Sequence, residues 1–521
     1  MCEITLFRSL WRGLGGGSAG PDGVSFSGAG MLPSAFPVSE LAAASVATAG
    51  AAVAGLVRRL EEGPPADRGR APGLAAGRPT DGGSAPDVQA GRPTDRGRAP
   101  DVEVDRGLAS LWFGQSFKPV GWELPPAWDA IAGDYECADG WIRLHTNAPH
   151  HRLAALRVLG LAPESATRQS VAAEVAAWSG ADLESAVVSA GGCAAEMRSA
   201  SRWREHPQGG AVAAEPLVHW QLTSGGAAGG GTDAAAWVQP VAHPVAQPVT
   251  KGSAGRPLAG VRVLDLTRVL AGPVATRFLA GYGAEVLRID PPEWSEPALE
   301  PEMTLGKNCA RLDLKTEAGV RRLKELLAGA DILVHGYRPS ALRGLGLGDD
   351  VLAAEYPQLV NVALDAYGWT GPWAGRRGFD SLVQMSCGIA ESGMRHYGSA
   401  RPRPLPVQAL DHATGYLLAA AAVLAWTRRL DGGIWTARAS LARTAVELMA
   451  ARGPAGPDAP GTKDDGGAGQ EPPSAADYTG IPEETAWGPG ERLPMPVTVR
   501  GVPVSWDVPA RGYGSAPARW K

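Results

Sequence analysis

Hydrophobic and polar positions alternate in an informative order between residues 257 and 290. A short aliphatic run occupies 261–266, helical spacing follows at 275–279, and a second buried run occupies 285–289. This order of strand, helix and strand predicts the opening βαβ unit of a parallel sheet. Ligands of such sheets bind beyond the carboxyl ends of the strands, which here predicts a site at 267–272.

Further segments extend the pattern on both sides. An apolar helix is predicted at 39–62, with Ser39 as its cap, and another at 416–426. Residues 139–145 read as a strand, and helical spacing follows at 152–159 and 171–178. The predicted fold class is therefore α/β: a doubly wound, mostly parallel sheet at about 257–450, with a smaller α+β module at about 108–224.

Glycine and proline, at 69 and 44 residues, mark the segments between these units. A repeat at 76–89 and 90–103 has few apolar residues to bury and predicts a flexible linker rather than a solenoid. The predicted organisation is as follows: 1–30, disordered extension; 31–62, helical segment; 63–107, repeat linker; 108–224, α+β module; 225–256, linker; 257–450, Rossmann-like domain; 451–521, mostly disordered tail with a short β stretch near 497–504.

Charge and cysteine content restrict the partners and the compartment. The net charge of −5 and the pI near 6.0 give no reason to expect a nucleic-acid partner. The five cysteines are odd in number and form no C-x-x-C pair, which suits a reduced, cytoplasmic protein. No membrane span is expected, because 41–57 consists chiefly of alanine and glycine and 416–426 is too short. His145, His150 and His151 lie close together without acidic or cysteine ligands at metal spacing, so no metal site is predicted.

A series of motifs continues in one register from Pro257 to Trp426. After the opening PLAGVRVLDLTRVLAGP come GKN at 306–308, ARLDLK at 310–315, ADILVHGYRP at 330–339, YGWTGP at 367–372, GFDSLVQ at 378–384 and Leu410-Asp411. In this series the chain resembles the family III CoA-transferases, of the formyl-CoA and carnitine-CoA transferase type. Residues 139–145 and 190–209 also resemble the small domain of that family.

The resemblance implies an activity and a nucleophile. In the family, an aspartate attacks an acyl-CoA thioester to form a mixed anhydride, CoA returns onto the aspartyl carbonyl, and a second acid collects the CoA. Asp411 stands where the family carries this aspartate, at a position predicted to be the N-cap of the apolar helix. The implied substrates are an acyl-CoA, which supplies coenzyme A, and a small carboxylic acid.

The same resemblance implies contacts to CoA. Val269, Leu270 and Ala271 correspond to the thioester end, and the other matching positions are Leu312, Gly336, Tyr337, Leu345 and Arg377. Arginine pairs well with phosphate groups, so Arg288, Arg338 and Arg343 are further candidates for the phosphates of CoA.

Two alternatives remain open. The α-methylacyl-CoA racemases share the fold but use a histidine in a G-H-D motif, whereas Phe379 at that position cannot take a proton. His412 adjoins Asp411, but consecutive helical residues point about 100° apart. A non-catalytic CoA-binding relative is the second alternative. It is suggested by the apolar Leu270, by Gly336 in place of asparagine, and by the missing glycine-rich loop after Asp411.

The order of the units departs from a single family copy, because small-domain material precedes the nucleotide-binding half. A tandem or permuted chain explains this order. We expect the two modules to form one globule, which could pair further into a homodimer.

Overall fold

The computed structural model describes residues 2–16, 23–62, 101–223, 251–452 and 473–521, the last range without 475, 476, 479 and 481. A seven-stranded sheet lies at its centre, in the order β10-β9-β8-β11-β12-β13-β7, with only β7 antiparallel to its neighbour. The strands are β8 Arg262–Leu266, β9 Glu285–Asp290, β10 Lys307–Arg311, β11 Ile332–His335, β12 Val360–Asp365, β13 Trp435–Ser440 and β7 His219–Leu222. The order reverses between β8 and β11, so the predicted doubly wound, mostly parallel sheet is confirmed.

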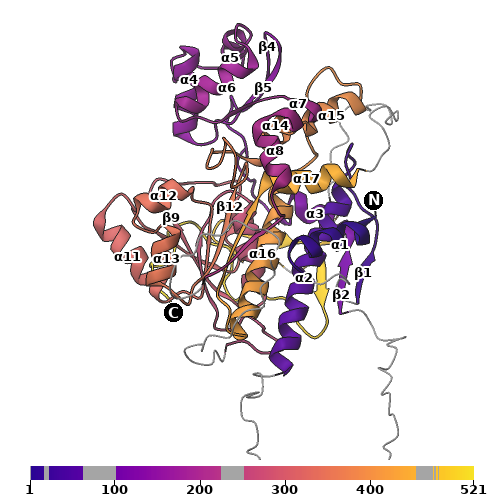
Figure 1. The fold of residues 1–521 in the computed structure, drawn as a ribbon, viewed down its shortest axis with the longest axis vertical. Coiled ribbons are helices and arrows are strands. Elements are labelled where there is room, and N and C mark those ends of the chain that lie inside the picture. The colour runs from indigo at the N-terminus through magenta and orange to yellow at the C-terminus, as the bar shows by residue number, and fades with distance from the viewer. Residues whose placement is uncertain are drawn as a thin grey trace, which may run out of the picture.

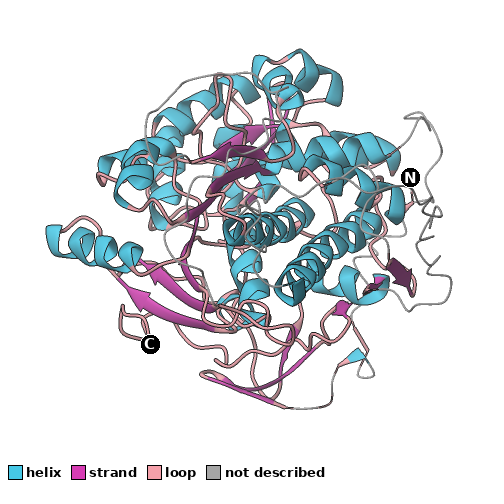
Figure 2. Cartoon of the chain, turned by 60° about the horizontal axis from the view of Figure 1, so that its bottom comes forward, coloured by secondary structure: helices cyan, strands magenta, loops and turns pink. Residues whose placement is uncertain are grey.

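Alternate residues of the strands enter two different cores. Val263 of β8 faces a cluster with α9 (Ala271–Gly281), α16 (Ala409–Leu430) and α2 (Val38–Glu62). Leu264 faces the opposite cluster, which contains α11 (Glu317–Ala328), α12 (Pro339–Gly344) and α13 (Asp349–Glu355). Burial on both faces explains why these parallel strands read as nearly continuous aliphatic runs. Figure 1 shows α11, α12 and α13 on the side away from α2 and α16, and Figure 2 shows the strands among the helices.

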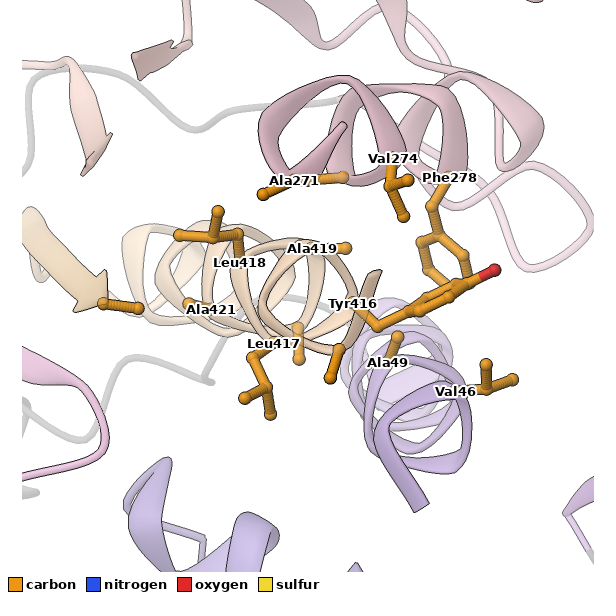
Figure 3. Packing of buried hydrophobic residues seen from close by; sticks show 14 of the residues in the cluster. Val46, Ala49, Ala271, Val274, Phe278, Tyr416, Leu417, Leu418, Ala419 and Ala421 are labelled. Carbon is orange, nitrogen blue, oxygen red and sulfur yellow. The ribbon is translucent and has the colours of Figure 1, made fainter. Parts of the chain in front are cut away.

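Helix α16 is the central helix of the larger core. It packs against α9 on one side and against the alanine-rich α2 on the other (Figure 3). Helices α2 and α16 are both long and apolar enough to cross a membrane by length and composition, but 83% and 94% of their apolar windows are buried inside the protein. The prediction that the second helix is too short, at 416–426, is wrong, because it extends over 22 residues.

Within the predicted disordered extension 1–30, the described residues 2–16 and 23–30 contain a helix and a strand. Helix α1 (Glu3–Gly13) buries Leu6, Phe7 and Leu10 in the core beside α2, and β1 (Val24–Ser27) pairs with β2 (Val102–Asp105). The amphipathic spacing of these three residues buries one face of a helix.

The carboxyl-terminal segment is also more ordered than predicted. Strands β14 (Glu483–Thr485), β15 (Gly488–Arg492) and β16 (Val497–Val499) pair with each other or with β3 (Phe117–Pro119) and β2. Its aromatic residues bind the large sheet unit: Trp506 donates to the Arg277 carbonyl at 2.9 Å and Trp520 to the Leu326 carbonyl at 3.0 Å. The predicted linkers are 63–107 and 225–256, and most of each, 63–100 and 225–250, lies outside the described residues. The described end of the first linker is not a linker, because it contains β2.

The smaller module has its own core and stands at the top of Figure 1. It contains β4 (Gly133–Cys137), β5 (Gly140–Leu144), β6 (Ala194–Glu196), α4 (Pro149–Leu159), α5 (Arg168–Val175) and α6 (Gly180–Ser189), followed by α7 (Ala200–Glu205) and α8 (Pro207–Ala214). Residues 219–222 were predicted to belong to this module, but they form β7 and complete the large sheet. Arg376 bridges to Glu184 of the module at 2.9 Å and Gln208 donates to the Tyr367 carbonyl at 2.8 Å, so the two units are in direct contact.

Candidate active site

Asp265 anchors the loop that follows β8. Its buried carboxylate accepts hydrogen bonds from the Thr267 N–H at 2.9 Å and the Thr276 hydroxyl at 2.5 Å, and pairs with the Lys307 ammonium at 3.1 Å. Burial raises the pKa of Asp265, but the charges of Lys307 and Arg288 and the hydrogen bonds from Thr267 and Thr276 together outweigh it, so the pKa is lowered. Lys307 also donates to the Pro273 carbonyl at 2.9 Å. The ionised carboxylate therefore fixes both ends of this loop.

Val269 occupies the sharpest point of the same loop. With φ of 63° it is the one non-glycine residue of positive φ within the described ranges, and a β-branched side chain makes this conformation costly. Its N–H donates to the Glu296 carboxylate at 3.0 Å. Glu296 is held in turn by Arg288 at 3.3 Å and by the Tyr513 hydroxyl at 2.8 Å. The carboxyl-terminal segment thus helps to hold a predicted substrate-binding residue.

Helix α9 begins directly after this turn, at Ala271. Leu270 is its N-cap residue and supplies no side-chain hydrogen bond to the helix. The first N–H groups of a helix lack intrahelical partners and carry partial positive charge. Val269, Leu270 and Ala271 therefore surround a place that favours an anion, at the carboxyl edge of the sheet.

Asp411 lies in the first turn of α16, but the prediction that it is the N-cap is wrong. Gln408 is the N-cap residue and makes no side-chain capping bond. The missing acceptor comes from another helix: Asp380, the first residue of α14 (Asp380–Ser386), accepts the Asp411 N–H through Oδ2 at 2.9 Å. Gln384 donates to the other oxygen of Asp380. A carboxylate from 31 residues earlier in the chain thus caps the helix.

A glycine brings Asp411 close to the turn at Val269. A Cβ on Gly415 would lie 2.5 Å from the Ala271 carbonyl oxygen, so α16 and α9 approach closely at this point. Residues four apart share one face of a helix. Asp411 therefore lies one turn above the contact, on the side of α16 that faces the start of α9.

The two carboxyl groups have unusual acidities. Burial raises the pKa of Asp411 well above its ordinary value, and the neighbouring Asp380 raises it further. Burial also raises the pKa of Asp380, to about 6, although hydrogen bonds from the Asp411 N–H and Gln384 oppose the shift. No hydrogen bond reaches the Asp411 carboxyl group from the described residues. Of the two carboxyl groups, Asp411 therefore holds a proton more tightly.

The smaller module presents two histidines beside this pair. The His145 ring stacks on Phe379 with centroids 3.7 Å apart, and the His151 ring meets Phe379 edge-on at 5.9 Å. Burial lowers the pKa of each histidine to about 3, so both are neutral. Phe379 directly precedes Asp380, and β5 and β6 of the module pack against α14, so the module lies against the helix that carries Asp380.

Three arginines gather where the module meets the edge of the sheet. Arg268 lies over the Trp294 ring at 4.6 Å and donates to the Tyr337 hydroxyl at 3.3 Å. Burial, and next the charge of Arg377, lower the pKa of Arg338. Burial, Arg377 and Arg268 lower the pKa of His150 in the same way. No carboxylate of the described segments forms a salt bridge with any of the three arginines, so their charges are available to an anionic ligand.

The other predicted CoA contacts flank this cluster. Gly336 and Tyr337 follow β11, while Leu312 follows β10 and Leu345 ends α12, both partly buried against the α11–α13 core. Arg288 is no phosphate ligand, because it is fully buried and pairs with Asp290 at 2.9 Å and with Glu296. The exposed Arg343 remains a candidate.

Sequence reasoning missed several residues of the site. Asp380, Glu296, Arg268 and Tyr513 were not identified, although Asp380 belongs to the GFD motif and could have been noticed there. His412 is separate from the pair, since its ring stacks on Phe113 of α3 (Arg106–Gly114) at 5.1 Å. The described segments contain no group of three or more His, Cys, Asp or Glu side chains placed to hold a metal ion.

Comparison with known proteins identifies the larger unit. Residues 258–479 match the sequence profile of CoA-transferase family III, and the predicted resemblance is confirmed for this part of the chain. A probable fatty acyl-CoA transferase of Mycobacterium tuberculosis is 33% identical over 193 residues, 34% of this chain and 48% of that protein. Succinyl-CoA:glutarate CoA-transferase of Mus musculus is 36% identical over 184 residues, 33% of this chain and 41% of that protein. The chain thus matches less than half the length of these relatives.

Among solved structures, a CaiB/BaiF family protein from Brucella suis is 25% identical. The alignment covers 38% of this chain and 56% of that protein, with a TM-score of 0.33.

Proposed function

We propose that this chain, whose residues 258–479 match CoA-transferase family III, transfers CoA from an acyl-CoA to a carboxylic acid, with Asp411 as the nucleophile. One observation carries the proposal: Asp411 is 7% exposed and lies one turn from the contact between Gly415 and the uncapped start of α9, at the carboxyl edge of the sheet. A structural carboxylate buried to this degree normally has hydrogen-bond donors around it. The Asp411 carboxyl group has no such donor among the described residues, and its pKa is raised.

The chemistry balances through a single carboxylate. The ionised Asp411 attacks the thioester carbonyl, CoA thiolate leaves, and a mixed anhydride forms. The thiolate then attacks the aspartyl carbonyl, which releases the first acid and leaves a thioester between CoA and Asp411. The second acid attacks this thioester and displaces the thiolate, which returns to the acyl carbonyl of the new anhydride. The new acyl-CoA leaves and Asp411 is regenerated.

Two features support this sequence of steps. The free N–H groups at the start of α9 are suited to stabilise the oxyanion of each tetrahedral intermediate. The smaller module covers Asp380 through Phe379, His145 and His151, and so limits the access of water, which would hydrolyse an anhydride.

The arginine cluster fits the phosphate groups of CoA. Arg268, Arg338 and Arg377 come from three loops at one edge of the sheet, and arginine binds phosphate in a bidentate manner. Tyr337 and Trp294 offer aromatic faces beside Arg268. We infer that CoA lies between the sheet edge and the smaller module, with its thioester towards Asp411.

The experiment uses a panel of acyl-CoA thioesters with hydroxylamine, followed by mass spectrometry of the peptide around Asp411. The parent protein is expected to form an aspartyl hydroxamate at Asp411, and Asp411→Asn to form none while still binding immobilised CoA. Asp139→Asn, a carboxylate change in the smaller module, is the matched control and should form the adduct. An Asp411→Asn variant that transfers CoA at the parental rate would show that another group is the nucleophile.

A non-catalytic CoA-binding role is the second candidate. Leu270 makes the turn beside Asp411 apolar, which favours this alternative. Binding to immobilised CoA without an adduct from any thioester would support it. We further propose that the protein acts in the cytoplasm, in keeping with five free cysteines. The homodimer stays a prediction.

A further inference from the structure

We propose that Asp380 is a positioning residue that fixes the backbone of the nucleophile and, through its own negative charge, makes the Asp411 carboxylate a stronger nucleophile. The inference rests on the proposed function, because it concerns how Asp411 reacts. It adds a second carboxyl group, 31 positions earlier in the chain, to the working parts of the site.

The geometry shows how Asp380 fixes the backbone of Asp411. Asp380 is completely buried, and its Oδ2 accepts the Asp411 N–H at 2.9 Å. The backbone of Leu410 also lowers the pKa of this carboxylate. Since Gln408 provides no cap, Asp380 supplies the acceptor that the first turn of α16 needs, from a different helix. Gln384 in turn holds Asp380, and its own Oε1 accepts the Leu405 N–H at 2.7 Å.

The charges around Asp380 show how it acts on the reactivity of Asp411. Helix α14 packs against β5, β6, α15 (Ile389–His396), α16 and α17 (Leu441–Ala451). The ionisable groups of these elements that act on Asp380 are Asp411 and Arg143. Arg143 is already paired with Asp134 at 2.7 Å. The carboxyl pair therefore has no partner of its own to neutralise it among the described residues.

The other carboxylates on these elements pair with arginines, and burial lowers the pKa values of the histidines His396 and His412. Glu196 of β6 pairs with Arg198 and Arg202, Glu391 of α15 with Arg395, and Arg443 of α17 with Glu447. Asp380 and Asp411 thus interact chiefly with each other.

Two adjacent carboxyl groups in a dry site do not both ionise easily. Asp380 receives N–H donors and Asp411 receives none from the described residues, so Asp380 keeps the negative charge. An Asp411 carboxylate formed next to it is unusually basic, and nucleophilicity rises with basicity. Attack on the thioester removes the charge of Asp411, and so relieves the repulsion between the two groups. The charge of Asp380 therefore favours the neutral acyl-aspartate over the free carboxylate.

The variant Asp380→Asn separates position from charge. Asparagine retains an oxygen that can accept the Asp411 N–H but carries no charge. Two quantities are measured against pH: the rate of adduct formation at Asp411, and the ionisation of Asp411 itself by NMR of 13C-labelled aspartate, assigned with Asp411→Asn. We expect the midpoint of both curves to move down by about one pH unit or more in Asp380→Asn, with a slower rate at the alkaline plateau.

Controls make the result unambiguous. Asp139 is exposed and accepts the N–H of Gly180, the first residue of α6, at 2.8 Å. Asp139→Asn therefore removes another carboxylate that accepts a helix N–H, and should leave both curves unchanged. Asp380→Ser is a second uncharged variant should Asp380→Asn fail to fold. A lower rate at every pH with an unmoved midpoint would reduce Asp380 to a structural cap and overturn the inference. If the parent forms no adduct, the proposed function fails, and the NMR midpoint still decides the role of Asp380.

Discussion

Val269 combines a β-branched side chain with a left-handed backbone, and a bond from its N–H to Glu296 holds it there. Such strain is tolerated only where the surroundings determine the conformation, and it is concentrated at functional sites. Here the surroundings include Tyr513, more than two hundred residues away in sequence. We interpret the strain as the cost of directing the turn before α9 towards the substrate.

The first prediction concerns this strain. Val269→Gly should raise the free energy of unfolding by about 1 kcal/mol, because glycine adopts positive φ without a steric penalty. The looser turn should at the same time slow CoA transfer. Urea unfolding followed by circular dichroism measures the change in the free energy of unfolding. Val269→Ala, which keeps a Cβ, should raise this free energy by less than Val269→Gly does. A Val269→Gly protein destabilised by several kcal/mol would show that the side chain contributes more than the strain costs.

The second prediction concerns Asp411 and stability. Its pKa is raised in the folded protein, so the folded state binds the proton more tightly than the unfolded chain. The stability contributed by this proton is lost as pH rises from about 4 through the folded pKa. Asp411→Asn should therefore unfold at a higher temperature than the parent at pH 8, and the difference should shrink at pH 5. An equal difference at both pH values would contradict the shifted pKa.

At the residue scale, the sequence could locate Asp411 but not its partner. The register of motifs identifies a position, whereas the bond between Asp380 and the Asp411 N–H depends on how α14 meets α16. Arg288 illustrates the converse error. It was taken as a phosphate candidate, but period-2 geometry places it on the same side of β9 as Asp290, where the two pair inside the protein. Whether a strand arginine faces solvent or the core is decided by the layers around the sheet.

At the scale of elements, the contact between α16 and α9 places the nucleophile. Gly415 permits it, since an added Cβ would collide with the Ala271 carbonyl. Figure 3 shows the next turns of the same interface, where Tyr416 and Ala419 of α16 face Val274 and Phe278 of α9.

The third prediction tests this contact. Gly415→Ala should destabilise the protein by about 1–3 kcal/mol and lower the rate of CoA transfer more than tenfold, because α16 must move away from α9 and carry Asp411 with it. Gly55 in α2 is the matched control, since a Cβ there would meet nothing within 4 Å. Gly55→Ala should stabilise the protein by up to about 1 kcal/mol, as alanine is the better helix former. Thermal unfolding and transfer assays compare them, and equal behaviour of the two variants would refute the close contact.

A helix or strand could be predicted when its own residues carry the pattern, and could not when it depends on pairing with a distant segment. The aliphatic strands β8 and β9, together with α9, are visible in the sequence because both faces of each strand are buried. Strands β7 (HWQL), β14 (EET) and β15 (GPGER) are short and have few apolar residues, so their pairing partners define them, whereas β16 (VTV) lies in the β stretch predicted near 497–504. Helix α16 exceeds its predicted range because its last turns contain arginine, and Arg429 is paired with Asp331.

At the scale of the whole molecule, four buried histidines couple stability to acid. Burial lowers the pKa of His145, His151 and His412 to about 3 and of His335 to about 4. The unfolded chain takes up these protons near pH 6.5, so stability is lost as pH falls from there towards the folded values. Asp365 and the pair Asp380 and Asp411 have raised pKa values and act in the opposite direction.

The fourth prediction isolates one of these histidines. His412→Leu should reduce the change of unfolding free energy between pH 6 and pH 4 by about 1.4 kcal/mol per pH unit, the effect of one proton. The substitution also removes a buried Nδ1 that has no hydrogen-bond partner in the described structure, so stability at pH 7.5 should not fall greatly. Urea midpoints across this pH range measure the slope. A parental slope in His412→Leu would mean that this histidine titrates normally in the folded state.

The last prediction concerns the division of the chain. Residues 257–450 contain Asp411 and six strands of the large sheet, but the face of α16 that packs on α2 and the edge of β13 that pairs with β7 belong to contacts with other segments. An isolated 257–450 fragment therefore exposes apolar helix surface and an unpaired strand edge, both of which promote aggregation. We expect light scattering to show that the fragment aggregates, and co-expression with residues 1–224 to improve its solubility.

The carboxyl-terminal segment should also be required, since Tyr513 and Trp506 hold the site from outside the fragment. The full chain is the control. A soluble, monomeric 257–450 fragment that binds CoA without any of these segments would show that the sheet unit is autonomous and that the shared core is dispensable.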